Sequence, residues 1–503
     1  MKKIILLLPL LALALVGCDG ELTAAPVVTD PNNEQKSGDP QSGDIIKILH
    51  LNDTHGSIEY RPDDNEPGMA YLAGYVNTIR EQANTNVVLV SSGDMFQGSL
   101  DSNISQGKLM IDIMKEMRFD SMSIGNHEFD WGVDVLKENA AYAMNKEEGD
   151  WSFPFLSGNI LNPEGQYDFG YLSTTFNRGP ARVSVIGSID NGVYDSIDGP
   201  IVEGYEFVNA TSMVISEAQR LRQAGSDIII YSTHDVDKRV DKSIADYVDA
   251  IFTGHSHHNS VLTMKNSDFK SVPIIESSSN GRAIGEVEFI YDSAKESYSL
   301  NGYKNTNLLN GSITLVEDEA VQSIYDAYLD APAQDGPVQS ESLRALKNDK
   351  IGEINSDSIF ASIDGTISKL SVQQMFLQAQ LDAYSESYDI IGSSYNESRS
   401  AWNVGDITYA DVYKAFPFDN ATVIVEATGK QLELWGTLTI FIDGLNKYSL
   451  EDNDMYQIVT STYIINNREQ NYYTSIIHTD ADIFQRHVMY QQFIEASAPN
   501  PWN

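Results

Sequence analysis

From Ile45 onward, short apolar runs alternate with longer stretches in which apolar residues recur every three or four positions. The short runs predict buried strands, and the periodic stretches predict amphipathic helices. The expected strands span 45–51, 87–90, 121–124, 182–189, 227–231 and 249–252. The expected helices between them include 71–82, 108–117 and 212–224. Such alternation is typical of an α/β domain whose sheet is covered by helices on both faces.

The alternation weakens after about residue 315, which predicts a domain boundary. Residues 317–329 predict one more helix, and residues 331–336 form a break that contains proline and glycine. We expect residues 316–349 to link an α/β domain at 45–315 to a second domain at 350–503. A chain of 503 residues is also too long for one compact core.

The N-terminus has the pattern of a secretory signal, with Lys2 and Lys3 followed by an apolar run at 4–16. The run is too short to cross a membrane comfortably. Its ending, Leu15–Cys18, resembles the bacterial lipobox, in which the cysteine is lipidated and becomes the mature N-terminus. We therefore expect residues 1–18 to be a lipoprotein signal peptide with Cys18 as the lipidation site.

This interpretation predicts an exported lipoprotein of the bacterial cell envelope that faces the periplasm or the exterior. A lipid on the cysteine would hold the protein on a bilayer without a spanning helix. Residues 19–44 contain several Pro, Gly, Ser, Asp and Asn and almost no large apolar side chains, so we expect a flexible tether there.

The formal net charge of −39 limits the possible partners. So negative a surface repels nucleic acid polymers, and it also repels an anionic substrate at long range. An anionic substrate would need a concentrated local positive charge, for which bound metal ions are the obvious source. With Cys18 as its one cysteine, the chain can form neither an intramolecular disulfide nor a thiolate metal site.

Five of the expected strands are followed by Asp, Asn or His. The five segments are Asn52–Gly56, Ser92–Ser99, Gly125–Asp130, Ser232–Asp235 and Gly254–His258. Since ligands collect outside the carboxyl ends of strands in α/β sheets, we expect these side chains along one edge of one sheet. Turn formation would explain the Asp, Asn and Gly residues, but it does not explain why six of the nine histidines fall here.

Seven of these side chains form a candidate metal site. They are Asp53, His55, Asp94, Asn126, His234, His255 and His257. Imidazole and carboxylate ligands without sulfur suit Zn, Mn, Fe or Co. Seven ligands are too many for one tetrahedral ion but suit two ions that share a carboxylate. Two such ions can clamp the attacking and leaving oxygens of a phosphoryl group.

Together and in this order, the five segments resemble the calcineurin-like metallophosphoesterases. The stretch Gly125–Gly132, GNHEFDWG, is close to the signature of the bacterial 5′-nucleotidase and UDP-sugar hydrolase group. The resemblance implies an α/β fold: a four-layer αββα metallophosphoesterase sandwich followed by a smaller α+β domain like the 5′-nucleotidase C-terminal domain.

The same resemblance implies roles for the candidate residues. Asp94 would bridge two divalent metal ions, and the other six ligands would be divided between them. One ion would also be bound by Asp53, His55 and His257. The other ion would also be bound by Asn126, His234 and His255. His127 and Asp130 would be the catalytic residues, with His127 stabilising the transferring phosphoryl group or protonating the leaving oxygen.

In the second domain, Gly405–Tyr409 and Pro417–Asn420 resemble the family's substrate-binding segments. This implies a substrate-binding set of Arg399, Phe418, Asn420, Tyr463 and Glu469. The rings of Phe418 and Tyr463 would stack on a nucleobase, and Glu469 would lie near the ribose. The alternative is that both rings are core aromatics.

The resemblance predicts hydrolysis of 5′-nucleotides, from nucleoside monophosphate to nucleoside and phosphate, or of nucleotide sugars. The family's other substrate-gripping arginines are missing, because no arginine lies between Arg344 and Arg399. That gap keeps open a 2′,3′-cyclic phosphodiesterase or a non-nucleotide phosphatase. A third possibility is a catalytically silent, ligand-binding surface lipoprotein, since the second domain departs from the family pattern.

Overall fold

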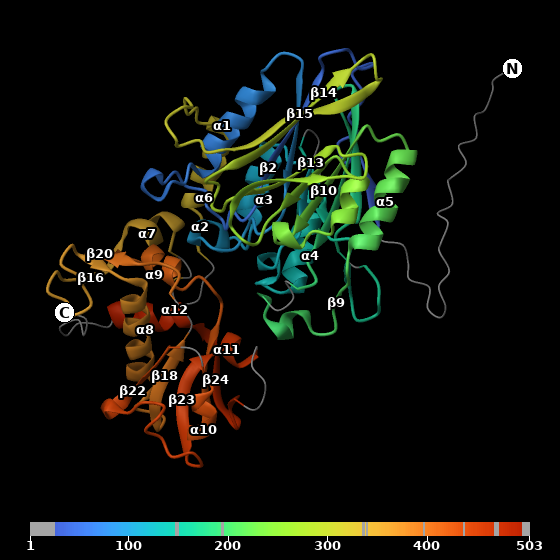
Figure 1. The fold of residues 1–503 in the computed structure, drawn as a ribbon. Coiled ribbons are helices and arrows are strands. Elements are labelled where there is room, and N and C mark those ends of the chain that lie inside the picture. The colour runs from blue at the N-terminus through green and yellow to red at the C-terminus, as the bar shows by residue number, and fades with distance from the viewer. Residues whose placement is uncertain are drawn as a thin grey trace.

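A computed structural model describes residues 26–494, apart from 146–149, 168, 193–195, 334–337, 339–340, 396–397, 436–437 and 467–471. The predicted signal peptide, with Cys18, and the predicted ribose contact Glu469 lie outside the described residues. Figure 1 shows two domains, the first coloured blue to yellow and the second orange to red. Among the described residues, no helix is both long and apolar enough to cross a membrane.

Two sheets form the centre of the first domain (Figure 1). The six-stranded sheet, in the order β15-β14-β2-β3-β4-β5, comprises β2 (Ile45–Leu51), β3 (Thr85–Ser91), β4 (Ser121–Ser123), β5 (Phe155–Leu156), β14 (Ile284–Asp292) and β15 (Ser297–Thr306). The seven-stranded sheet, in the order β1-β7-β8-β10-β11-β13-β12, comprises β1 (Val27–Thr29), β7 (Ser173–Arg178), β8 (Ala181–Ile189), β10 (Ile228–His234), β11 (Ala250–Thr253), β12 (Asn259–Lys265) and β13 (Ser271–Ser277). Strands β2 to β5 are parallel, and so are β8, β10, β11 and β13.

Helices cover the outer face of each sheet. The six-stranded sheet is covered by α1 (Gly68–Arg80), α3 (Lys108–Glu116), α4 (Val133–Met144) and α6 (Glu319–Leu329), and the other sheet by α5 (Thr211–Gln223). Successive strand residues point to opposite faces, so Ile48 packs between the sheets while Leu49 packs under the helices. Both faces are therefore apolar, which explains the continuous apolar runs. The predicted four-layer αββα sandwich is confirmed.

The segment before β2 does not behave as the predicted flexible tether from residue 26 onward. Strand β1 pairs in parallel with β7 at the edge of the seven-stranded sheet. The Asn32 side chain donates to the Ser152 carbonyl at 2.8 Å, and the Ser37 amide donates to the Gly179 carbonyl at 3.0 Å. Polar residues here satisfy backbone groups of the domain, a role that composition alone does not reveal.

The second domain is α+β, as predicted. Its five-stranded sheet, in the order β22-β18-β23-β21-β24, comprises β18 (Ile390–Tyr395), β21 (Ala421–Thr428), β22 (Leu438–Phe441), β23 (Met455–Ser461) and β24 (Ser475–Phe484). Its helices are α8 (Lys369–Tyr384), α9 (Tyr409–Ala415), α10 (Gly429–Glu433), α11 (Thr462–Asn466) and α12 (Gln485–Ile494). Two short strand pairs also belong to the second domain: β16 (Lys350–Ile354) with β20 (Gly405–Thr408), and β17 (Thr366–Ile367) with β19 (Trp402–Asn403). A third short pair, β6 (Ile160–Leu161) with β9 (Glu206–Phe207), belongs to the first domain.

Contacts around α7 (Leu343–Asn348) and α2 (Leu100–Asn103) hold the second domain over the carboxyl ends of the first domain's strands. Leu100 and Leu343 pack in one apolar cluster with Tyr409. The Lys347 ammonium donates to Asp101 at 2.6 Å across the same contact. The second domain therefore faces the strand ends on which the sequence places the candidate metal site.

Candidate metal centre

The candidate metal ligands lie at the facing edges of two sheets, so the prediction of a single sheet edge is wrong. Asp53, Asp94 and Asn126 follow β2, β3 and β4 of the six-stranded sheet. His234 ends β10 of the seven-stranded sheet, and His255 follows β11. Strands of both sheets have the same apolar pattern, so the sequence shows the strand ends but not which strands pair.

Sharp turns of the backbone direct these side chains toward one another. Five of the seven candidate ligands have positive φ angles: 49° at Asp53, 48° at His55, 52° at Asp94, 73° at His255 and 58° at His257. For residues other than glycine this conformation is uncommon and costs about 1–3 kcal/mol each. Such strain persists where surrounding structure enforces it, and it concentrates at functional sites.

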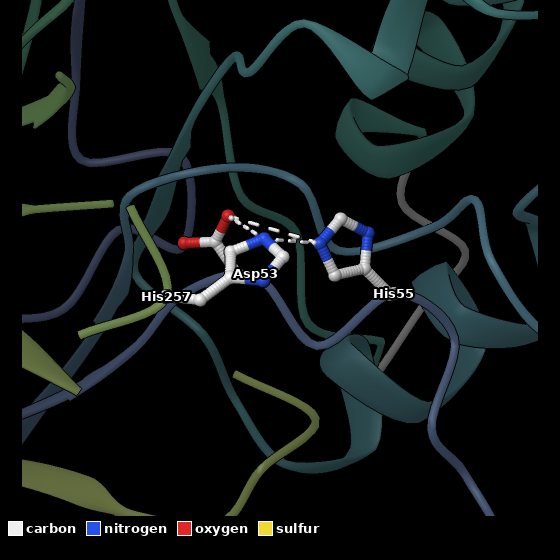
Figure 2. Close-up of side chains that lie close together, drawn as sticks. All are labelled: Asp53, His55 and His257. Atoms are coloured by element: carbon white, nitrogen blue, oxygen red, sulfur yellow. Dashed lines mark hydrogen bonds and ion pairs between the residues drawn. The ribbon is translucent and has the colours of Figure 1, made fainter. Parts of the chain in front are cut away.

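Asp53, His55 and His257 form the first cluster (Figure 2). His55 Nε2 lies 3.0 Å from His257 Nε2, which lies 3.3 Å from Asp53 Oδ1. His55 Nδ1–H donates to the Gln97 carbonyl at 3.0 Å, which leaves the lone pair of Nε2 facing the cluster. A carbonyl that fixes the far nitrogen of an imidazole is a common feature around metal-binding histidines.

Asp94, His234 and His255 form the second cluster, together with Asn126. His234 Nδ1–H donates to the Ser92 carbonyl at 2.7 Å. The opposite nitrogen, Nε2, lies 3.1 Å from Asp94 Oδ2 and 3.2 Å from Asn126 Oδ1. The other oxygen of Asp94 accepts from the His127 amide at 2.9 Å. Electron pairs from three side chains therefore converge, and a cation would satisfy all of them.

The charges of the centre also favour a cation. Asp94 is buried, yet its pKa lies well below the usual range because the imidazoles of His234 and His127 outweigh the effect of burial. Burial alone would lower the pKa of His234, but the Asp94 and Asp53 carboxylates raise it to about 10. A bound metal ion would therefore take the place of the proton that these carboxylates hold on Nε2. The protein thus holds carboxylates ionised in a buried place, where they attract positive charge.

His127 and Asp130 form the predicted dyad at the rim of the centre. His127 Nδ1–H donates to Asp130 Oδ2 at 2.8 Å. Burial would lower the pKa of His127, but Asp130 and Asp94 raise it to about 9. The Asp130 carboxylate therefore orients His127 and favours its protonated form.

Glu128 is a positioning residue to which the sequence reasoning assigned no role. Its buried carboxylate accepts from the amides of Asp94, Met95 and Gly125 at 2.9, 2.8 and 2.7 Å. It thereby ties the loop that carries Asp94 to the loop that carries Asn126. A Cβ on Gly125 would lie 2.2 Å from Asp94 Oδ1, so only glycine fits there. Gly125 and Glu128 both lie in the stretch GNHEFDWG, so the sequence motif already contained these two residues.

Glu128→Ala is expected to destabilise the protein. The substitution leaves three buried amides without an acceptor, and each unsatisfied group costs about 1–3 kcal/mol. We expect the free energy of unfolding in urea to fall by roughly 3 kcal/mol or more. Glu138→Ala, on the exposed face of α4, is the matched control and should change it by less than about 0.5 kcal/mol. Equal, small changes in the two variants would contradict the role of Glu128.

A cavity of about 680 Å³ lies between the metal centre and the second domain. Four of the predicted substrate-binding residues line it: Arg399, Phe418, Asn420 and Tyr463. Lys369, which the sequence reasoning missed, lines it as well and adds a second positive charge. No local pattern distinguishes this lysine, because its place depends on where α8 begins.

The Phe418 ring lies next to the dyad rather than in the core of the second domain. Its centroid is 5.9 Å from that of His127, with the two rings 21° from parallel. The Arg399 guanidinium carbon lies 4.9 Å from the same ring. One domain thus presents an aromatic face and a cation directly beside the catalytic candidates of the other.

Comparison with known proteins supports this arrangement. Residues 46–259 match the calcineurin-like phosphoesterase family, and residues 350–439 match the 5′-nucleotidase C-terminal domain. Protein UshA of Yersinia enterocolitica is 26% identical over 436 residues, which are 77% of this chain and 75% of that protein. Human 5′-nucleotidase is 28% identical over 313 residues, which are 55% of this chain and 51% of that protein.

The fold has a similar counterpart among solved structures. A 5′-nucleotidase precursor from Thermus thermophilus superposes with a TM-score of 0.66 at 20% identity, covering 90% of this chain and 96% of that one. Residues 46–259 therefore form a domain of the calcineurin-like phosphoesterase family, which uses divalent metal ions. The chain combines this domain with a 5′-nucleotidase C-terminal domain and is homologous to UshA and the 5′-nucleotidases.

Proposed function

We propose that this protein hydrolyses phosphate esters, 5′-nucleotides or nucleotide sugars above all, with two divalent metal ions. The ions would be Zn, Mn, Fe or Co, held by Asp53, His55, Asp94, Asn126, His234, His255 and His257. The observation that carries this proposal is the convergence of ligand atoms in two neighbouring clusters, with Asp94 grouped both with His234 and His255 and with His55 of the other cluster. The Nδ1 atoms of His55 and His234 are fixed by the Gln97 and Ser92 carbonyls, so Nε2 of each ring faces the centre.

Bound divalent ions would supply Lewis-acid polarisation of the phosphoryl group and would lower the pKa of water. They fit the donor set, which contains imidazole, carboxylate and amide oxygen. They would also provide the local positive charge that a chain of net charge −39 needs to hold an anionic ester.

His127 is the proposed acid. With Nδ1–H bound to Asp130, its Nε2–H is available to the phosphoryl group or to the leaving ester oxygen. The proton would pass from Nε2 to the leaving oxygen as the ester bond breaks. Asp130 keeps the ring oriented and stabilises its positive charge.

The cavity residues of the second domain are proposed to bind the remainder of the substrate. The Phe418 ring offers a flat face, and Arg399 and Lys369 supply positive charge in a cavity otherwise rich in carboxylates. Tyr463 and Asn420 line the same space, while the predicted ribose contact of Glu469 remains a proposal from the sequence.

Phe418→Ala is expected to raise KM for a nucleoside monophosphate by about 5- to 100-fold, because stacking of a base on an aromatic ring is worth roughly 1–3 kcal/mol. KM for a small alkyl phosphate, which has no ring to stack, should change less than about threefold. Steady-state kinetics on both substrates measures the difference. An equal effect on both substrates would show that Phe418 supports the site without binding a base.

The direct test of the proposed function is a substrate panel with metal-loaded protein. The panel contains nucleoside monophosphates, UDP-sugars, 2′,3′-cyclic nucleotides and an aryl phosphate. We expect nucleoside monophosphates or UDP-sugars to have the highest kcat/KM. Failure to turn over any member with Mn or Zn supplied would reject the proposal, and preference for a cyclic or non-nucleotide ester would shift it to that substrate class.

We also propose that the protein is exported and anchored in the bacterial cell envelope by a lipid on Cys18. The apolar run at 4–16 and the lipobox-like ending motivate this proposal. Detergent phase partitioning of the native protein tests it: Cys18→Ala should move the protein to the aqueous phase, and an unchanged distribution would refute the anchor.

A further inference from the structure

A second, smaller cavity lies at the opposite end of the first domain from the metal centre. Its volume is about 240 Å³, and three arginines line it: Arg80, Arg118 and Arg178. It lies where β3 begins and β7 ends, whereas the metal centre follows the carboxyl end of β3. The seven residues of β3 place the two sites roughly 20 Å apart, at about 3.3 Å per residue.

Convergence of three guanidinium groups needs an explanation in a chain with 33 basic and 72 acidic residues. Arg80 is held in place by the Met117 carbonyl at 2.7 Å and by the Asn77 side chain at 3.0 Å. Burial, together with Arg118 and Arg178, lowers the pKa of Arg80 to about 10 despite the opposing effect of Asp120. The three positive charges therefore repel one another, and a bound anion would relieve that repulsion.

Arg118 is exposed, and its side chain is not paired with a carboxylate in the described structure. Its φ angle is 58°, a conformation that glycine or asparagine adopts more easily. Its guanidinium has no hydrogen-bond or ion-pair partner among the described residues, and its carbon lies 5.9 Å from the Trp151 ring centroid. Arg178 lies against the same ring at 5.5 Å, and its buried Nε has no hydrogen-bond partner in the described structure. Donors in this cavity are thus available to a ligand.

The cavity already contains one carboxylate, that of Glu34 on the docked N-terminal segment. Glu34 and Asp120 each form an ion pair with Arg178. Burial and the nearby Asp120 and Asp30 raise the pKa of Glu34, although Arg178 opposes the shift. Ionisation of Glu34 is therefore less favourable here than in water. A phosphate oxyanion, by contrast, offers several oxygens to the planar guanidinium groups of more than one arginine.

We propose that this cavity is a second binding site, specific for a phosphate oxyanion, which displaces the Glu34 carboxylate from Arg178 and also engages Arg80 and Arg118. The volume admits inorganic phosphate or the phosphate of a lipid headgroup but is below the usual range for drug-sized ligands. This site is independent of the metal centre and of the proposed function.

The test is isothermal titration of the full chain with inorganic phosphate, with the metal-loaded and the chelator-treated protein. Binding at the second site should persist after chelation. Arg118→Asn removes one donor group while suiting the left-handed backbone, so the fold is retained and Kd should rise at least fivefold. Glu34→Gln removes the competing charge and should lower Kd at least threefold. Arg344→Asn, at an exposed arginine elsewhere, is the control and should leave Kd unchanged.

Vesicles of phosphatidylglycerol distinguish the two sources of phosphate. If inorganic phosphate gives a heat of binding and Arg118→Asn reduces that heat, the site binds the free anion. If inorganic phosphate gives no such heat, but the protein sediments with vesicles and Arg118→Asn reduces this sedimentation, the site binds a lipid headgroup. If Arg118→Asn changes neither, or if all binding disappears on chelation, the site does not exist. A Kd for Glu34→Gln no lower than that of the native protein would overturn the displacement of Glu34.

Discussion

Asp94→Asn is expected to lower kcat/KM for a nucleoside monophosphate by at least about 10²–10³-fold, since a single preorganised electrostatic contact at the reacting group is worth that much. Asp94 belongs to the second cluster and is also grouped with His55 of the first, and one of its oxygens lies 3.1 Å from His234 Nε2 while the other accepts from the His127 amide. Asparagine keeps the shape of the side chain but removes the charge that would bridge two cations. The bound metal should therefore fall together with the activity.

The control for Asp94→Asn is Asp134→Asn, which makes the same chemical change at an exposed position in the first turn of α4. It should leave both kcat/KM and the metal content unchanged. Circular dichroism of both variants checks that the fold is retained. Full activity of Asp94→Asn in a folded protein would contradict a bridging role.

His127→Asn is expected to lower kcat by about 10²–10⁴, the usual contribution of a positioned general acid or base. The side chain remains polar, but its amide reaches only as far as the Nδ1 position, and it cannot carry the positive charge that Asp130 and Asp94 stabilise on the imidazole. His127 could form a group of ligands with His55 and Asp94, but it lies outside the two proposed ligand sets, so the metal content should stay at the native value. This separates His127→Asn from Asp94→Asn, which should lose metal.

A second measurement sharpens the test of His127. Asp130→Asn keeps the imidazole but weakens its orientation and charge, so we expect a smaller loss of kcat than in His127→Asn. Equal kcat values for the native protein and His127→Asn with the best substrate of the panel would exclude the dyad from the reaction.

Much of the first domain follows from local pattern. The strand predicted at 45–51 has the same bounds in the structure, and the helix predicted at 212–224 is observed as Thr211–Gln223. These elements are buried on one or both faces, so the apolar periodicity records their environment directly. The sequence also revealed the chemistry at the strand ends, because Asp53 and Asp94 lie in the short polar segments that follow the strands β2 and β3.

Other features depend on contacts between distant segments. The division of the strands into two sheets arises from pairings such as β14 with β2, which no local pattern indicates. The docked segment at 26–44 has the composition of a linker, and only its contacts with β7 and Ser152 show otherwise. Lys369 and the arginine cavity are likewise products of tertiary arrangement.

Elemental analysis of the purified, metal-reconstituted protein tests the central claim most directly. A two-metal centre should give close to two equivalents of a divalent transition metal per chain, with activity lost on chelation and restored on return of the metal. Less than one equivalent in fully active protein, or activity that survives complete removal of the metal, would contradict a two-metal centre.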